Sequence, residues 1–305
     1  MNTKTTKRAL VLGSGGSRGA LQVGAIRALY EMGFTPDLIT GASIGAANAS
    51  FLAVNGFNQA GIDKLQHVWE TTIDRNLMPT NLWWQFMRAF FKRTKGFSQE
   101  QIRAFAVANG VTPDLRFRDL PDMELYPVAS DLNAGLPVVF GQNPDESVLE
   151  SMLASMALPP WFTPIESNGH LLIDGGAVSN LPIEAALMHG ATEIIALDLS
   201  DPLDGKSDKR DISHLLVKLD KAVEGRHKSL ELELAEARGV PVKHIILTGE
   251  TPVPFWDFRH ARELIERGYR QTYQAMEQEP LEQRQSWFTR SGLRELALDI
   301  LEVLD

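Results

Sequence analysis

Ser43 lies between two glycines, in the stretch Gly41-Ala-Ser-Ile-Gly45. The residues before it predict a short strand at 37–40, and the small apolar residues after it predict a helix at 44–54. A serine at a sharp strand-to-helix turn needs glycines two positions away, because the strained backbone leaves no room there for side chains. The helix would point its amides at the serine, where an oxyanion develops during acyl transfer. We interpret Ser43 as a nucleophile; the alternative is a turn that serves only tight packing.

A carboxylate, Asp174, ends the apolar run 171–173 and is followed by Gly175 and Gly176. The two glycines allow the backbone to turn away sharply after a strand. Asp174 is therefore a candidate general base. A free aspartate is too acidic for that role near neutral pH, so the role requires partial burial or an aligned hydrogen bond to Ser43. The alternative is an aspartate that only closes a turn.

A glycine-rich loop at 13–19 follows a predicted buried strand at 9–12 and precedes a predicted helix. The dinucleotide-binding motif would need glycine where Arg18 stands, and the phosphate loop would need Gly-Lys-Ser/Thr. A third use of such a loop is to aim the N–H groups of Gly15 and Gly16 at a negative oxygen. Arg18 is expected to brace the loop or to meet an anionic head group. A tight connection without chemistry is the alternative.

The composition excludes several kinds of chemistry. The chain of 305 residues is 44% hydrophobic and 23% charged, as in ordinary globular proteins. Its formal net charge of -9 argues against nucleic acid as a general partner. With no cysteine there is no disulfide, thiolate nucleophile or cysteine-ligated metal. The polar start lacks a signal-peptide pattern and no run of eighteen apolar residues occurs, so we expect a cytoplasmic protein, with peripheral contact at the inner membrane face left open.

Strands and helices alternate along the rest of the chain, which is typical of a mostly parallel sheet. The pattern predicts strands at 124–129, 136–140, 171–173, 193–199 and 243–247, and helices at 61–72, 147–156, 181–190, 212–238 and 261–276. The first of these strands and the next resemble a hairpin. We expect a catalytic core at 1–200 and a mainly helical extension at 201–305, packed on the same domain.

Two apolar segments are candidates for lipid contact. The stretch 81–95 contains Trp83, Trp84, Phe86 and Phe90 beside four basic residues. It is expected either to contact a membrane surface or cap an apolar site, or to be a buried helix with a basic end. The proline-rich loop 159–164 would wall an acyl pocket or be a packed surface loop.

The glycine loop at 15–19, the serine turn at 41–45 and the triplet 174–176 together resemble the patatin-like phospholipase family in order and separation. Two segments between them, 130–135 and 155–157, are also similar to that family. The resemblance covers about residues 8–200. One departure is Ser14, because the family usually has glycine two positions before Gly16.

The resemblance implies a three-layer α/β/α fold with a mostly parallel sheet and a Ser-Asp dyad. The family hydrolyses fatty acyl esters of phospholipids, lysophospholipids or neutral lipids without a metal or other cofactor. Carried over, Ser43 is the nucleophile, Asp174 the base, and the amides of Gly15 and Gly16 the oxyanion donors. The residues that complete the motifs are Arg18, Gly19, Gly41, Gly45, Gly175 and Gly176.

Three other readings of the same residues stay open. A Ser-His-Asp hydrolase would take its histidine from His189, His214, His227, His244 or His260, although none sits in a recognisable motif. An acyltransferase would use a similar serine turn with an acceptor other than water. A lipid-binding regulatory module would keep the fold without turnover.

Overall fold

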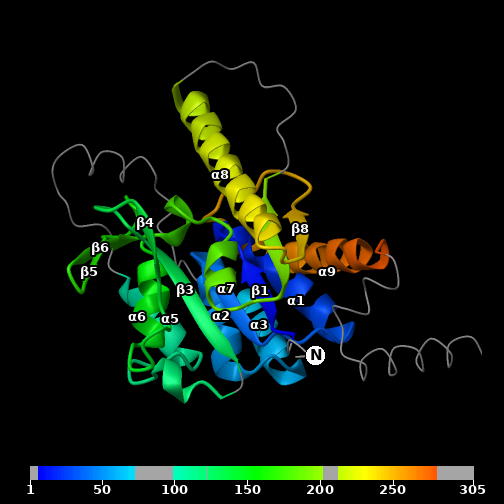
Figure 1. Cartoon of the computed structure of the whole chain (residues 1–305), viewed down its shortest axis with the longest axis horizontal. Helices are drawn as coiled ribbons and strands as arrows, with labels where there is room; N and C mark the ends of the chain where they lie inside the picture. Colours follow the sequence, from blue (N-terminus) through cyan, green and yellow to red (C-terminus); the bar gives the residue numbers. More distant parts are fainter. Residues whose placement is uncertain (1–5, 73–98, 122, 202–211, 280–305) are drawn as a thin grey trace, which may run out of the picture.

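The computed structural model describes residues 6–72, 99–121, 123–201 and 212–279, with side chains described in these ranges except at 212–214, 216, 217 and 220. The strands are β1 (Arg8–Leu12), β2 (Leu38–Ala42), β3 (Glu124–Asp131), β4 (Leu136–Val139), β5 (Ile165–Ser167), β6 (His170–Ile173), β7 (Glu193–Ser200) and β8 (Val242–Thr248). The helices are α1 (Gly19–Glu31), α2 (Ile44–Asn55), α3 (Gln59–Thr72), α5 (Glu100–Ala108), α6 (Val148–Ser155), α7 (Ile183–Met188), α8 (Ile212–Ala237) and α9 (Ala261–Glu277). Figure 1 shows their arrangement.

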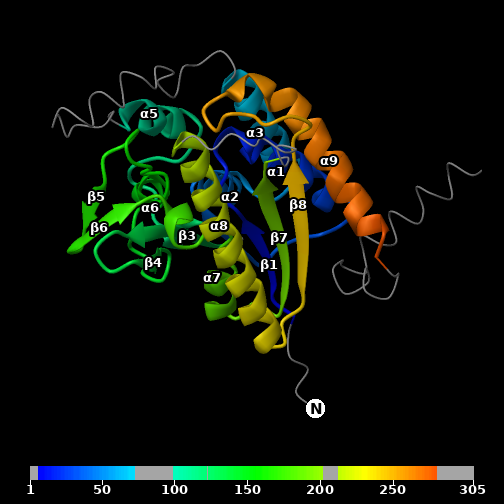
Figure 2. The ribbon, with the colours of Figure 1, turned by 90° about the horizontal axis from the view of Figure 1, so that it is seen from above.

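The strands form one mixed, mostly parallel sheet in the order β5-β6-β3-β2-β1-β7-β8, with β4 paired to β3. The five central strands are parallel, and β1, β7 and β8 run side by side in Figure 2. The antiparallel strands β4, β5 and β6 extend the sheet beyond β3. In the parallel part, the loops that leave the carboxyl ends of β1 and β2 emerge at the same edge, which is where the glycine loop and Ser43 lie.

Helices cover both faces of the sheet. Successive side chains of a strand point to opposite faces, and in the central strands both sets are apolar and buried. Leu10 and Leu12 belong to the larger core, together with α1, α2, α3 and α9. Ala9 and Val11 belong to a second core with α7 and the C-terminal part of α8. Figure 2 shows α8 and α1 on opposite sides of β1 and β7. The expected α/β/α architecture is confirmed.

Most of the elements expected from the sequence are present, with ends shifted by a few residues. The helix predicted at 181–190 is shorter, since it begins after Pro182, and two elements, α5 and β5, were not predicted. Helix α1 is buried around most of its surface, because α9 packs against it in addition to the sheet. The segment 81–95 and most of the loop 201–211 lie outside the described residues.

The C-terminal third packs on the same sheet. Strand β8 pairs in parallel with β7 from Ile194–Val242 to Ser200–Thr248. Leu264 and Ile265 of α9 lie in the larger core. In Figure 2 the orange helix α9 lies next to β8 and α1. Residues after 200 therefore extend the sheet by a strand and add a helix to each of its faces, α9 to the larger core and α8 to the second core.

Candidate active site

Ser43 sits at the tip of a strained turn between β2 and α2. Its backbone has φ 54° and ψ −122°, which non-glycine residues rarely adopt. A Cβ atom on Gly45 would lie 2.1 Å from the carbonyl oxygen of Leu12, and one on Gly41 would lie 2.5 Å from that of Gly45. Both glycines are needed because the backbone approaches itself closely, as the sequence pattern predicts. The turn exposes Ser43 to a cavity while the strand before it stays buried.

The hydroxyl of Ser43 donates a hydrogen bond to Asp174 Oδ2 at 2.5 Å. The other carboxylate oxygen, Oδ1, accepts the N–H of Gly176 at 2.8 Å. Asp174 is only 4% exposed. Burial raises its pKa to about 6, although the hydrogen bonds from Ser43 and Gly176 favour the charged form. Both conditions for a basic role, burial and an aligned hydrogen bond, are present in this geometry.

Two buried serines hold the dyad in position. Ser155 Oγ accepts the N–H of Ser43 at 2.9 Å and donates to the carbonyl of Val128 at 2.6 Å. Ser130 Oγ donates to the carbonyl of Asp174 at 2.8 Å. These serines lie in the two segments, 130–135 and 155–157, that the sequence had linked to the family without a role. They fix the backbone on both sides of the contact between Ser43 and Asp174.

The glycine loop is shaped by its own strained backbone and by the C-terminal third. Gly16 has φ +59°, and a Cβ atom on it would lie 2.5 Å from the carbonyl oxygen of Phe255. That oxygen accepts the N–H of Ser17 at 2.8 Å. Within the described chain, no hydrogen bond engages the N–H groups of Gly15 and Gly16. Both residues line the same cavity as Ser43.

Arg18 braces this loop. Its Nε donates to the carbonyl of Gly15 at 3.1 Å, and its guanidinium is paired with Asp201 at 2.8 Å. The side chain thus ties the loop to the end of β7. This contact matches the first of the two roles considered for Arg18.

A buried amide network, which the sequence analysis did not predict, supports the loop. Gln22 donates to the carbonyl of Gly13 at 2.8 Å, and Asn48 donates to Gln22 at 3.0 Å and to the carbonyl of Gly19 at 3.1 Å. The indole N–H of Trp69 donates to Asn48 at 2.9 Å. In the sequence, the only indication of such a network is that Gln22 and Asn48 are polar residues within largely apolar helices. Buried polar side chains usually have hydrogen-bond partners.

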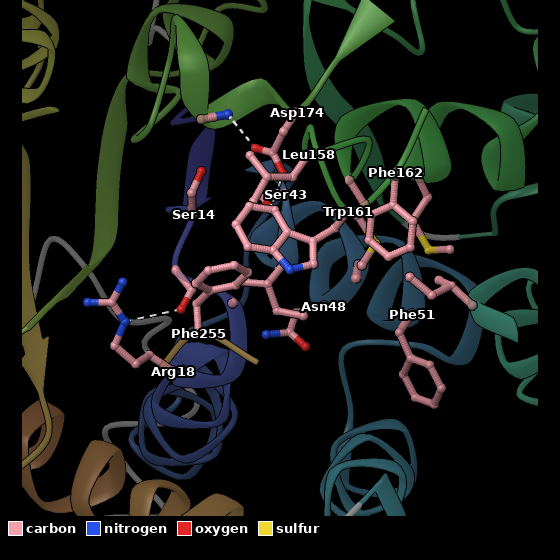
Figure 3. Close-up of a pocket in the computed structure, with 18 of the residues that line it drawn as sticks. Ser14, Arg18, Ser43, Asn48, Phe51, Leu158, Trp161, Phe162, Asp174 and Phe255 are labelled. Carbon is pink, nitrogen blue, oxygen red and sulfur yellow. Dashed lines mark hydrogen bonds between the residues drawn. The ribbon is translucent and has the colours of Figure 1, made fainter. Parts of the chain in front are cut away.

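A cavity of about 530 Å³ opens at the dyad. Ser43 and Asp174 form its polar end, and Figure 3 shows aromatic side chains gathered around them. Trp161 and Phe162 come from the loop 159–164, whose Pro159–Pro160 peptide bond is cis. Much of the remaining wall is apolar and includes Phe51, Trp69, Phe105, Met152 and Met156. Such a cavity fits a molecule with an apolar chain and one polar reacting group.

The C-terminal third also lines the cavity, which the sequence did not predict. It contributes Val223, Glu224 and His227 from α8, and Phe255 and Phe258 from the loop before α9. The ring of Phe255 packs edge-on against Trp161, with centroids 4.7 Å apart. The feature of the sequence that could have indicated this contribution to the cavity is the pair of adjacent aromatic residues Phe255 and Trp256.

No histidine joins the dyad among the side chains that the structure describes. His227 lines the cavity without a hydrogen bond to Ser43 or Asp174. His189 stacks on Tyr126, His244 lies 3.0 Å from Asp198, and His260 lies near Asp257. The side chain of His214 is outside the described set.

Comparison with known proteins identifies the family. The sequence pattern described as "Patatin-like phospholipase" matches residues 10–187, more than half of the chain. The chain belongs to the patatin-like phospholipase family. It is 33% identical over 210 residues to the mouse patatin-like phospholipase domain-containing protein 7, covering 68% of this chain and 14% of that protein. An uncharacterized NTE family protein of Mycobacterium bovis is 34% identical over 197 residues, which is 63% of this chain and 49% of the relative.

Among solved structures, VipD from Legionella pneumophila is similar with a TM-score of 0.45 and 15% identity, covering 88% of this chain and 66% of that one. The chain spans about a seventh of the length of the mouse relative, patatin-like phospholipase domain-containing protein 7. The patatin-like family consists of hydrolases of lipid esters in general. No helix in the described part of the chain is long and apolar enough to cross a membrane.

Proposed function

We propose that this patatin-like protein is a serine hydrolase of lipid acyl esters, of the phospholipase A, lysophospholipase or carboxylesterase type. One observation carries the proposal: Ser43 Oγ donates to the buried Asp174 carboxylate at the polar end of an apolar cavity. A nucleophile bonded to its base, next to free backbone N–H groups, is the arrangement that acyl transfer requires. The apolar wall supports a fatty acyl chain as the part of the substrate that is bound.

In this mechanism Ser43 Oγ attacks the ester carbonyl while its proton moves to Asp174. The N–H groups of Gly15 and Gly16 stabilise the oxyanion that forms on the carbonyl oxygen. The intermediate then collapses, the alcohol part leaves with the proton from Asp174, and the acyl group stays on Ser43. Water attacks this acyl-enzyme, gives its proton to Asp174, and the fatty acid is released as Ser43 regains a proton.

Peripheral contact with a lipid surface is part of the proposal. The aromatic residues first considered for it, Trp83, Trp84, Phe86 and Phe90, lie outside the described residues. The described face that supports it is on α8, where Leu215, Leu219 and Val223 are exposed and four residues apart, so they share one side of the helix. Val223 also lines the cavity. A lipid at this face would therefore lie beside an edge of the cavity that contains Ser43.

The test is hydrolysis of a short-chain p-nitrophenyl ester by the wild type, Ser43→Ala and Asp174→Asn. We expect Ser43→Ala to be inactive and Asp174→Asn to lose roughly 10²- to 10⁴-fold in kcat, because an amide cannot accept the proton. Both variants should keep the wild-type circular dichroism spectrum. Turnover by Ser43→Ala at the wild-type rate would show that the mechanism is wrong.

The same assay separates the other readings. An acyltransferase would give more acylated acceptor than fatty acid when lysolipid or an alcohol competes with water. A lipid-binding module would bind lipid but release no p-nitrophenol from the wild type. Either result would replace hydrolysis as the function.

A further inference from the structure

Ser14 is the residue at which the glycine loop departs from its family pattern, and its hydroxyl has no role in the mechanism above. The side chain is 7% exposed, and its Oγ has no hydrogen-bond partner within the described chain. It lines the cavity that contains Ser43 and Asp174. In Figure 3 the hydroxyl is directed to the side of the cavity where Asp174 lies. A buried hydroxyl without a partner is unfavourable unless something else bonds to it.

The Ser14 hydroxyl lies close to Oδ1 of the Asp174 carboxylate, the oxygen that accepts the N–H of Gly176. A Cβ atom built on Gly176 would be 2.6 Å from Ser14 Oγ and 3.1 Å from Asp174 Oδ1. The two oxygens are therefore no farther apart than the sum of these distances, a span that one water molecule can bridge. Oδ1 is the oxygen that Ser43 does not use.

Asn180 adds a second unpartnered atom to the same wall. It is 8% exposed, lines the cavity, and its Oδ1 has no partner in the described chain. The backbone carbonyl oxygen of Asn180 accepts the N–H of Ser14 at 2.9 Å, so the backbones of the two residues are held together. A buried water is stable where two to four polar groups converge on it. Ser14 and Asp174 supply two such groups at one place, and Asn180 lines the same cavity, whose wall is otherwise mostly apolar.

We infer that Ser14, with Asn180, positions the water molecule that removes the acyl group from Ser43; this inference rests on the proposed function. In the acyl-enzyme the Ser43 hydroxyl is esterified, so Asp174 is free to accept a proton from that water. The water oxygen forms a bond to the acyl carbon, and its proton moves to Asp174. The bond between Ser43 Oγ and the acyl carbon then breaks, and Ser43 takes the proton back. Ser14 acts in this second step and not in the first.

The experiment is stopped-flow hydrolysis of a p-nitrophenyl ester by Ser14→Ala. We expect the first turnover, which forms the acyl-enzyme, to keep the wild-type rate within about twofold, and deacylation to slow about 3- to 10-fold, the effect of one lost hydrogen bond. A burst of p-nitrophenol would then precede a slow steady state, and acylated Ser43 would accumulate in the mass spectrum. Added hydroxylamine, a stronger nucleophile than water, should restore much of the turnover.

Ser50→Ala is the matched control. Ser50 on α2 is also buried with an unpartnered hydroxyl, but it does not line the cavity. We expect no change in either step for this variant. Equal slowing of both steps in Ser14→Ala would mean that the hydroxyl acts on the ester itself, and an unchanged deacylation rate would mean that it holds no reacting water; both overturn the inference. A wild type that forms no acyl-Ser43 would instead refute the proposed function.

Discussion

The carbonyl oxygen of Phe255 lies against Gly16, 2.5 Å from the place where a Cβ atom would be. The two residues are far apart in the sequence, yet the same oxygen accepts the N–H of Ser17 at 2.8 Å. The loop that presents the oxyanion donors is therefore held by a segment outside the matched region 10–187. The C-terminal third is part of the site as well as of the fold.

Gly16→Ala should remove activity and reduce stability together. The methyl group would meet the backbone of Phe255, and alanine would be strained at φ +59°. Displacing the loop moves the oxyanion donors, which should lower kcat by roughly 10²- to 10³-fold. Gly135→Ala is the control, since its φ is +67° but nothing lies within 4 Å of a built Cβ. If both variants lose the same stability and neither loses activity, the contact with Phe255 is unimportant.

Hydrolysis should depend on the ionisation of Asp174. Burial raises the pKa of this carboxyl to about 6, and only the ionised form can accept the proton of Ser43. Therefore kcat/KM for a soluble ester should rise with pH and reach half its maximum near that value. Circular dichroism across the same range controls for unfolding. A flat profile between about pH 5 and about pH 8 would argue against Asp174 as the base.

Glu231 should make the protein less stable as pH rises. This α8 residue is buried, accepts hydrogen bonds from the Ser179 hydroxyl and the Glu184 N–H, and burial raises its pKa to about 7. The folded state thus binds the proton more tightly than the unfolded state, so the stabilisation is present below the unfolded pKa and is lost as pH rises to about 7.

Urea unfolding at several pH values measures this effect. Glu231→Gln keeps hydrogen-bonding groups but has no carboxyl to ionise. The fall of its unfolding free energy with rising pH should therefore be smaller than that of the wild type, by up to about 3 kcal/mol. Glu233→Gln is the exposed control on the same helix. Parallel curves for the wild type and Glu231→Gln would contradict the prediction.

The exposed face of α8 should contribute to binding at lipid surfaces. Leu219→Glu places a charge on that face, where Leu219 is 60% exposed, so folding should be unaffected. We expect weaker co-sedimentation with phospholipid vesicles and unchanged cleavage of a soluble ester. Met188→Glu is the matched control, since Met188 is 55% exposed at the end of α7, does not line the cavity, and should leave vesicle binding intact. If Leu219→Glu binds vesicles as well as the wild type does, the exposed face of α8 does not contribute to lipid binding.

The sequence predicted the parts of the fold that depend on local patterns. The turn at Ser43 could be predicted from Gly41 and Gly45, because only glycine fits at these positions, where two backbone segments approach closely. Asp174 after an apolar strand likewise marks the end of β6. These features depend on residues a few positions apart, so spacing alone reveals them.

Contacts between distant segments could not be predicted in this way. Asn48, Ser155 and Phe255 support the site through hydrogen bonds or packing to residues far along the chain. Their residue types are common in ordinary helices and loops. Only the fold shows that Asn48 supports the glycine loop or that Phe255 closes on it, because burial and partners are set by tertiary packing.

The most direct test of the account is to trap the acyl-enzyme step with a fluorophosphonate and map the modified residue by mass spectrometry. Ser43, bonded to the buried carboxylate of Asp174, should carry the label in the wild type. Asp174→Asn should be labelled much more slowly, because the hydroxyl then lacks its base. A label on any other residue, or equal labelling of Ser43 in both proteins, would contradict the Ser43–Asp174 dyad.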